Sequence, residues 1–326
     1  NMNDSNFASL TPAQHRAVTS PLESRLVLAG PGTGKTRTLV HRVAYLIAEF
    51  HIPSEHILAV TYTNKATEEM RHRLRLMLPA DSPRLNVGTF HAFCIRVLRQ
   101  FYEAAGLPKH FAVTDEDGQL SVLQKVVPNL REKRDIRSLL GQLSTWRLSD
   151  PVERGELPEF QRETLAHYVT ALRKQALIDF DDILLLTEEL FDKRADVLAT
   201  VQAGFQAVLV DEFQDTDTLQ YRILKQLTGG RTPVFAVADD DQSIFAWRGA
   251  DPQNLRRFVQ DFLPCDTEPF VIKLEENYRC SGPIVDAANR LIGTGLRLFD
   301  KVPTAMVSEG APVKCFTYQT DRNEAE

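Results

Sequence analysis

The sequence predicts an α/β fold, in which helices flank a parallel β-sheet and an all-helical domain is inserted into the sheet domain. Short apolar, β-branched runs alternate with helical patterns, the first run leads into a glycine-rich loop, and a middle segment lacks clear strands. Strands that alternate with helices form parallel sheets, because each helix carries the chain back along the sheet. The predicted strands are residues 26–28, 57–61, 86–89, 207–210, 234–237 and 271–274.

The loop after the first predicted strand has the residues needed to bind phosphate groups. It reads Ala29, Gly30, Pro31, Gly32, Thr33, Gly34, Lys35 and Thr36, and a helical pattern begins at Arg37. Its glycines let backbone N–H groups face a polyphosphate, its lysine can reach the β and γ phosphates, and its threonine hydroxyl can bind Mg²⁺. Only the first position departs from the pattern G-x-x-x-x-G-K-[ST], with Ala29 in place of glycine. The loop predicts a nucleotide site at the carboxyl edge of the sheet.

Residues 106–176 differ from the rest of the chain because they lack clear strands. They contain helical stretches at 119–127 and 163–177 and a charged run at 130–135. We therefore expect a helical domain inserted into the sheet domain.

Composition excludes several classes of protein. The chain has 326 residues, of which 43% are hydrophobic and 25% charged, and no apolar run approaches the roughly 18 residues of a membrane span. The four cysteines lie far apart without C-x-x-C spacing, so neither a zinc site nor a disulfide framework is indicated. This composition is typical of a soluble chain of two or three domains.

The charge balance does not by itself indicate a nucleic-acid-binding protein. The chain has 38 Lys and Arg against 44 Asp and Glu, a net charge of −6. One segment is locally basic, with Lys65, Arg71, Arg73, Arg75, Arg84, Arg96 and Arg99 against Glu68, Glu69 and Asp81. This segment fits a phosphate-binding track or a solvated helix face equally well.

Two adjacent acids, Asp211 and Glu212, follow the apolar strand at residues 207–210. Beside a phosphate loop, Asp211 can hold Mg²⁺, and Glu212 can orient the water that attacks the γ phosphate. The alternative is that both acids cap a following helix at residues 216–227.

Polar and aromatic side chains follow the strand at residues 234–237. Gln242 could sense the γ phosphate, Phe245 and Trp247 offer faces on which nucleic-acid bases can stack, and Arg248 offers positive charge. Packing in the core is the alternative for the two aromatic residues.

These motifs, in this order, resemble the superfamily 1 DNA helicases of the UvrD, Rep and PcrA type over nearly the whole chain. Residues 10–14 are similar to the family's Q motif, in which Gln14 would read the adenine edge, and Thr11 can also cap a helix there. Arg37 matches an arginine that packs on the adenine ring in the family.

The resemblance also implies contacts with single-stranded DNA. Residues 61–66 match a motif in which Tyr62 lines a base pocket, residues 88–93 match the next such motif, and residues 179–182 match another. The contact residues implied by the first two motifs are Thr61, Tyr62, Asn64, Thr89, Phe90 and His91. Taken alone, His91 would be read as a structural histidine.

Residues 277–279 resemble the start of the family's second motor lobe. There Tyr278 would stack on the adenine opposite Arg37, and Arg279 would reach the γ phosphate. Ordinary packing at a domain hinge is the alternative for Tyr278.

The resemblance implies a RecA-like ATP-binding lobe formed by residues 1–107 and 177–276. It places the inserted helical domain at residues 108–176 and the beginning of a second lobe at 277–326. It implies an ATP-dependent DNA helicase or translocase, using Mg²⁺ and ATP and moving 3′ to 5′ on single-stranded DNA. Its expected partners are single-stranded DNA, junctions with duplex DNA, and repair or recombination proteins. We also expect a cytoplasmic protein with no membrane partner, and a monomer in the form of this chain.

Two later family segments, one bearing G-L-E and one supplying an arginine finger, do not occur in these 326 residues. Because an arginine finger contributes about 10³ to 10⁵ in rate, we expect this chain to be an N-terminal portion that binds nucleotide but hydrolyses it poorly. Two alternatives stay open. One is the helicase subunit of a recombination nuclease of the RecB or AddA type, and the other is a nucleotide-gated DNA-binding module that does not hydrolyse ATP.

Overall fold

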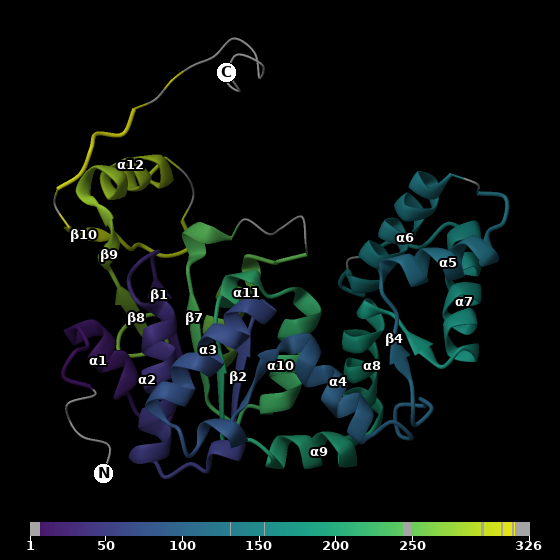
Figure 1. Ribbon diagram of the computed structural model, residues 1–326, viewed down its shortest axis with the longest axis horizontal. Coiled ribbons are helices and arrows are strands. Elements are labelled where there is room, and N and C mark those ends of the chain that lie inside the picture. Colours follow the sequence, from purple (N-terminus) through teal and green to yellow (C-terminus); the bar gives the residue numbers. More distant parts are fainter. Residues whose placement is uncertain are drawn as a thin grey trace.

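The protein is built around a six-stranded parallel sheet with the strand order β3-β2-β6-β7-β1-β8 (Figure 1). The computed structural model describes residues 7–130, 132–152, 154–243, 249–294, 297–307, 309–314 and 316. The strands are β1 (Arg25–Ala29), β2 (Ile57–Thr61), β3 (Asn86–Thr89), β6 (Ala207–Val210), β7 (Val234–Ala238) and β8 (Val271–Leu274). All six predicted strands and the α/β fold class are confirmed.

Helices cover both faces of this sheet, and β1, β2, β6 and β7 are therefore buried along their whole length. On β1, Leu26 and Leu28 join one buried cluster, while Val27 and Ala29 join the other. One face is covered by α1 (Pro12–Val18), α2 (Lys35–Ala48) and α3 (Asn64–Met77). The other is covered by α4 (Phe90–Gln100), α8 (Phe180–Lys193), α9 (Ala195–Ala203), α10 (Thr218–Thr228) and α11 (Gln253–Phe262).

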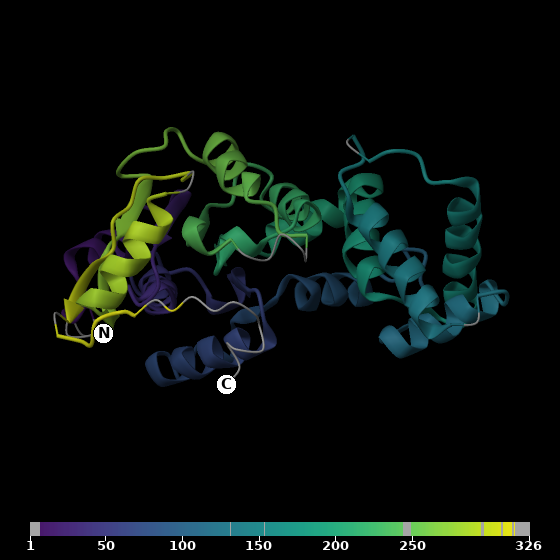
Figure 2. The same cartoon turned by 90° about the horizontal axis from the view of Figure 1, so that it is seen from above.

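Three helices, α5 (Glu116–Val126), α6 (Lys133–Leu148) and α7 (Glu159–Lys174), stand beside the sheet domain (Figure 2). They enclose a separate apolar cluster that includes Leu123, Leu143 and Leu172. Two short strands, β4 (Ala112–Val113) and β5 (Leu177–Ile178), pair in parallel where the helices join the sheet domain. The sequence did not reveal these strands, because two residues are too few to show an alternating pattern.

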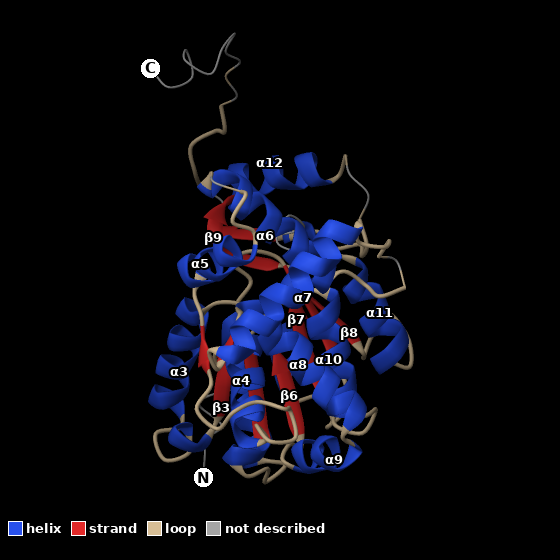
Figure 3. Ribbon diagram, turned by 90° about the vertical axis from the view of Figure 1, so that its right-hand side faces the viewer, coloured by secondary structure: helices blue, strands red, loops and turns tan. Residues whose placement is uncertain are grey.

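The last segment leaves the main sheet and lies over its carboxyl edge. It contains β9 (Glu276–Ser281), α12 (Gly282–Ile292) and β10 (Thr304–Val307), and β9 pairs in parallel with β10. Figure 3 shows α12 above the ends of the central strands. Short 3₁₀ turns lie at Ser54–His56, Ser82–Arg84, Phe213–Asp215 and Asp240–Gln242. Among the described residues, no helix is both long and apolar enough to cross a membrane.

Candidate functional site

The phosphate loop connects β1 to α2 at the carboxyl edge of the sheet. Gly32 and Gly34 have φ values of +73° and +89°, a conformation that favours glycine. The loop is closed by a 2.7 Å hydrogen bond from the Thr33 hydroxyl to the Gly30 carbonyl. Because α2 begins at Lys35, the free N–H groups of its first turn and its positive dipole end lie at the loop. The geometry therefore fits a bound polyphosphate.

Lys35 lies between this loop and the carboxylates that follow neighbouring strands. Its side chain is 11% exposed, and its Nζ lies 3.3 Å from Glu212 Oε2 and 3.7 Å from Asp239 Oδ2. The structure thus brings together the predicted phosphate-binding lysine and the second member of the acid pair.

The acid pair follows β6. Asp211 is 4% exposed and accepts a 3.1 Å hydrogen bond from the Glu212 N–H. Burial, and next the Glu212 charge, raise the pKa of Asp211 to about 7, while Lys35 acts in the opposite direction. A buried carboxylate with a raised pKa is a good ligand for a divalent cation, whose charge would favour the ionised form. Thr36, the second residue of α2, supplies a hydroxyl. These donors fit Mg²⁺.

The backbone at Glu212 is strained. Its φ and ψ are both 48°, which is uncommon for a residue with a side chain. Glu212 Oε2 also accepts a 2.8 Å hydrogen bond from Gln214 Nε2, which fixes the carboxylate. Helix α10 is capped by Asp217, which accepts a 2.7 Å hydrogen bond from the Gln220 N–H. Helix α10, the helix predicted at residues 216–227, therefore does not use Asp211 or Glu212 as its cap.

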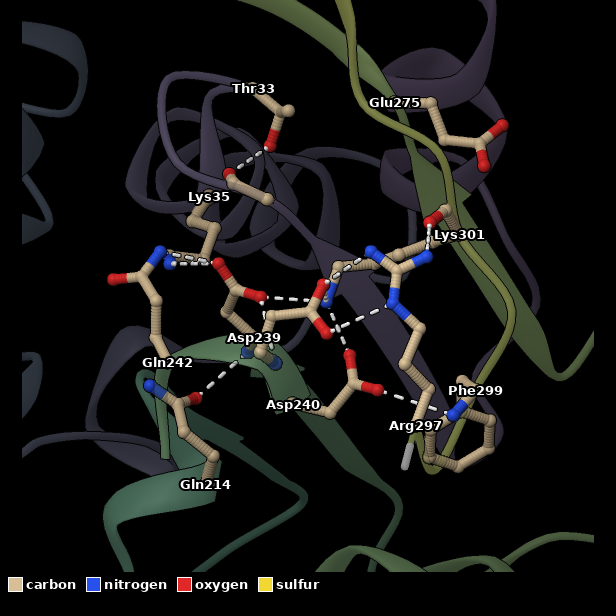
Figure 4. A network of polar contacts seen from close by, with 12 residues as sticks. Thr33, Lys35, Gln214, Asp239, Asp240, Gln242, Glu275, Arg297, Phe299 and Lys301 are labelled. Carbon is tan, nitrogen blue, oxygen red and sulfur yellow. Dashed lines mark hydrogen bonds and ion pairs between the residues drawn. The ribbon is translucent and has the colours of Figure 1, made fainter. Parts of the chain in front are cut away.

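A polar network surrounds the end of β7 (Figure 4), and Gln214 links it to Glu212 of the acid pair. The Asp239 N–H donates to Gln214 Oε1 at 2.9 Å, and Gln242 Nε2 donates to the Asp239 carboxylate. Lys301, from the last segment, also donates to Asp239, at 2.6 Å. No role was predicted from the sequence for Gln214, Asp239 or Lys301. Adjacent carboxylates at a strand end were the only local signal for this network.

The residues predicted to surround adenine lie next to the loop. Gln14 is buried, and its amide donates to the Thr33 carbonyl at 2.8 Å and accepts from the Thr11 N–H at 3.1 Å. It therefore supports the phosphate loop and also completes a capping box at the start of α1. The Arg37 guanidinium donates to the Ser9 carbonyl at 3.0 Å.

Strand β9 is hydrogen-bonded directly to the phosphate loop. Asn277 Nδ2 donates to the Pro31 carbonyl at 2.6 Å, and the Tyr278 N–H donates to the Gly32 carbonyl at 3.0 Å. The Tyr278 ring is half exposed, and its hydroxyl donates to Glu276 at 2.6 Å. That hydrogen bond raises the pKa of Tyr278, while the nearby Arg37 cation opposes the shift. Tyr278 and Arg279 are thus held beside the loop.

A second candidate site lies beyond the acid pair, in a cavity of about 370 Å³. Its lining residues are Thr61, Tyr62, Thr63, Thr89, Phe90, His91, Leu148, Phe180, Asp181, Leu184, Asp215, Asp217 and Gln220. The His91 and Phe180 rings stack with centroids 3.9 Å apart at 18°. Burial lowers the pKa of His91 to about 4, so its ring is neutral at pH 7. Phe180 belongs to the third predicted DNA motif, residues 179–182, in which no individual contact residue was predicted.

Of the other residues predicted to contact DNA, Thr89 and Thr61 make hydrogen bonds within the protein, while Asn64 is exposed. The Thr89 hydroxyl caps α4 by accepting a 3.1 Å hydrogen bond from the Ala92 N–H, and the Thr61 hydroxyl bonds to Thr67 at 2.6 Å. Asn64 is exposed at the start of α3. Phe245, Trp247 and Arg248 lie outside the described residues.

The basic segment is partly neutralised by its own acids. Arg71 pairs with Glu68 at 2.7 Å and Arg73 pairs with Glu69 at 2.5 Å, both within α3. Arg84 pairs with Asp81 at 3.1 Å. These pairs favour the solvated helix face for this part of the segment.

The parallel sheet, the glycine-rich loop after β1 and the acids after β6 define a P-loop nucleotide-binding protein with a RecA-like fold. The chain belongs to the UvrD/REP helicase family: the model of the UvrD/REP helicase N-terminal domain matches residues 10–263.

Curated relatives agree with this assignment. The chain is 39% identical over 296 residues to the ATP-dependent DNA helicase PcrA of Bacillus subtilis, an alignment that covers 88% of this chain and 40% of the relative. It is 37% identical over 327 residues to the ATP-dependent DNA helicase Rep of Escherichia coli, covering 97% of this chain and 48% of the relative. Identity to DNA helicase II of Escherichia coli is 35% over 330 residues, covering 97% and 45%. The chain thus spans less than half the length of these relatives.

Proposed function

We propose that this chain is the ATP-binding portion of a DNA helicase or translocase that moves 3′ to 5′ on single-stranded DNA by hydrolysing Mg-ATP. The observation that carries the proposal is the placement of Lys35 3.3 Å from Glu212, at a sheet edge that also borders an aromatic cavity. Strand β2 leads into that cavity through Thr61 and Tyr62, and the acid pair follows the adjacent strand β6. The nucleotide site and the proposed DNA site are therefore linked through two adjacent strands, so a structural change at the nucleotide can be transmitted to bound DNA.

In this proposal the backbone of residues 29–34 and the side chains of Lys35 and Thr36 bind the phosphates. Gln14 holds the loop in place and hydrogen-bonds to the adenine edge. Arg37 and Tyr278 stack on opposite faces of the adenine ring. Two hydrogen bonds support these assignments, because they hold the residues beside the phosphate loop: Gln14 donates to the Thr33 carbonyl, and the Tyr278 N–H of β9 donates to the Gly32 carbonyl.

Hydrolysis is assigned to the residues at the ends of β6, β7 and β9. Thr36 and Asp211 would hold Mg²⁺, which when bound supplies positive charge for the phosphate oxygens. Glu212 accepts a proton from the attacking water and orients it, and its bond from Gln214 holds the carboxylate for that task. Gln242 and Arg279 contact the γ phosphate and stabilise its charge as the bond breaks.

Single-stranded DNA is proposed to cross the aromatic cavity. Base stacking on an aromatic ring contributes about 1–3 kcal/mol and tolerates any base, which suits a translocase. Tyr62, Phe90 and His91 supply rings there, and Thr61 and Thr89 supply polar groups. Asn64, exposed at the start of α3, is proposed to contact the DNA outside the cavity. We also assign DNA contacts to three residues that follow β7: base stacking to Phe245 and Trp247, and a contact through its positive charge to Arg248.

The proposed domain bounds are 1–107 with 177–276 for the ATP-binding lobe, 108–176 for the inserted helical domain, and 277–326 for the start of a second lobe. The separate apolar cluster of α5, α6 and α7 supports the second unit. The departure of β9 from the main sheet supports the third. We also propose a cytoplasmic location, where ATP and chromosomal DNA meet in bacteria, the source of the relatives described above.

The test is steady-state ATP hydrolysis by the protein as its gene encodes it, with and without single-stranded DNA. The proposal predicts turnover that rises at least tenfold with DNA. Turnover that is absent under both conditions, with nucleotide and DNA still bound, would favour the non-hydrolysing DNA-binding module. A nuclease domain encoded in the same gene would favour the recombination-nuclease subunit.

A further inference from the structure

Three consecutive carboxylates, Asp239, Asp240 and Asp241, converge after β7. One oxygen from each lies within 4.8 Å of the others, and their side chains are 7% exposed or less. Buried carboxylates this close repel one another unless positive charge lies among them. Their geometry would also suit a cation, but a side chain of the protein already occupies the centre.

That side chain is Lys301. Its Nζ lies 2.6 Å from Asp239 Oδ1 and 3.0 Å from Asp241 Oδ2, and it also donates to Asp240. The lysine side chain is 0% exposed, so its ammonium group is neutralised by these carboxylates alone among the described residues. Arg297 adds a second cation, with Nε 3.4 Å from Asp241 Oδ1. Figure 4 shows both cations reaching the cluster from the last segment of the chain.

The segment that carries Lys301 is itself held in place. Arg297 donates to the Lys301 carbonyl at 2.8 Å, and the Val302 N–H donates to Glu275 at 2.8 Å. Pro303 follows closely over the phosphate loop, 3.1 Å from where a Cβ on Gly30 would stand. Lys301 therefore reaches the cluster from a loop that is itself held by hydrogen bonds.

Asp239 connects Lys301 to the nucleotide site. One oxygen of its carboxylate binds Lys301, and the other accepts from Gln242 and lies 3.7 Å from Lys35 Nζ. Its N–H reaches Glu212 through Gln214, over hydrogen bonds of 2.9 Å and 2.8 Å. A single carboxylate thus separates Lys301 from both the phosphate-loop lysine and the proposed γ-phosphate sensor.

We propose that Lys301 is a positioning residue for the nucleotide site, which acts by fixing Asp239 so that this carboxylate orients Gln242 toward the γ phosphate. Without the Lys301 cation, Asp239 would turn toward Lys35, the nearest remaining positive charge, and would release the Gln242 amide. The second lobe would thereby set how strongly the first distinguishes ATP from ADP. This inference rests on the proposed role of Gln242 but not on hydrolysis.

The experiment compares binding of ADP and of the non-hydrolysable analogue AMPPNP to the protein as its gene encodes it. The variants are Lys301→Met, Gln242→Ala and their combination, with Lys314→Met as the matched control, because Lys314 is exposed in the same segment. We expect Lys301→Met to reduce the preference for AMPPNP over ADP at least threefold, as Gln242→Ala does. The combined variant should lose no more than either change alone, and the control should match the wild type.

A purely structural role for Lys301 predicts a different result. Partial unfolding would lower the amount of active protein but leave the ratio of the two affinities unchanged. An unchanged ratio in Lys301→Met, or a combined variant whose losses multiply, would overturn the inference. Unfolding midpoints are measured on every variant. Where Lys301→Met does not fold, Lys301→Gln replaces it, since the amide keeps a hydrogen-bond donor without the charge. DNA-stimulated turnover of the wild type is measured separately, so failure of the proposed function is distinguishable.

Discussion

The ammonium group of Lys35 lies 3.3 Å from the carboxylate of Glu212, so the phosphate loop is paired with the proposed general base. Phosphate oxygens and Glu212 would compete for this one cation. Nucleotide binding should therefore draw Lys35 away and free the carboxylate to accept a hydrogen bond from water. The pairing gives the site a physical means of preparing its base only when substrate is present.

Replacing Lys35 by methionine should weaken Mg-ATP binding about tenfold to a hundredfold, because a charge-assisted hydrogen bond to phosphate contributes roughly 1.5–3 kcal/mol. Titration of the chain with a fluorescent ATP analogue measures the affinity. Lys174→Met is the control, since Lys174 is exposed on α7. Equal affinities for the two variants would contradict the assignment of Lys35 to the phosphates.

Gly32→Ala should damage the phosphate loop beyond the effect of its positive φ. A Cβ there would stand 2.5 Å from Arg279 Cβ and 2.9 Å from Asn277 Oδ1, so the loop and β9 would have to separate. Gly106→Ala is the control, because Gly106 has φ +66° and nothing within 4 Å of the added Cβ. The control should lose about 1–2 kcal/mol of stability and keep its nucleotide affinity. We expect Gly32→Ala to lose more stability and to bind Mg-ATP at least tenfold more weakly. Chemical denaturation and nucleotide titration measure both effects.

Phe180→Ala should weaken binding of single-stranded DNA by about 1–3 kcal/mol, the contribution of one aromatic stacking face. The ring is 53% exposed and stacks on His91 within the cavity. Phe160 on α7 is similarly exposed, at 56%, but does not line the cavity, so Phe160→Ala should leave DNA affinity unchanged. Fluorescence anisotropy with a labelled oligonucleotide makes the comparison. DNA affinity that falls equally in both variants would place the DNA elsewhere.

His91 should make the protein less stable as pH falls. Its pKa is lowered by burial from 6.5 to about 4, so between these values the unfolded chain binds a proton that the folded chain does not. Stability is therefore lost as pH falls below 6.5, by about 2 kcal/mol at pH 5. His91→Phe keeps a ring against Phe180 and removes this titration, so its stability should decline less between pH 7.5 and 5. His110→Phe, at an exposed position, is the control. Denaturation curves at both pH values give the difference, and a wild-type slope in His91→Phe would contradict the prediction.

The strands β1, β2, β6 and β7 could be predicted because each is a short apolar run buried along its whole length, a pattern that local composition reveals. The edge strand β3 is less apolar and was predicted from its place in the alternation of strands and helices. The phosphate loop and the pair Asp211 and Glu212 could also be located, because each follows directly after a predicted strand in the sequence. The meeting of Lys35 with Glu212 followed only indirectly, from the expectation that parallel strands bring their carboxyl ends to one edge.

Other parts of the site arise from contacts between distant residues and leave no local pattern. Lys301 meets Asp239 across 62 positions in the sequence, in a segment without strong periodicity. The positive φ of Glu212 depends on the packing around the strand end, since the residue itself does not favour that conformation. Gln14 was assigned from its motif to adenine, and its hydrogen bond to the Thr33 carbonyl became visible only in the folded chain.

The most direct test of the account is ATP hydrolysis by Glu212→Gln in the protein as its gene encodes it, measured with saturating single-stranded DNA beside nucleotide affinity. Glu163→Gln, exposed on α7, is the matched control. The account predicts that Glu212→Gln binds Mg-ATP within about threefold of the wild type and loses at least 10² in turnover, in the range of general base catalysis. Turnover equal to that of the wild type and the control would contradict the assignment of Glu212 as the base.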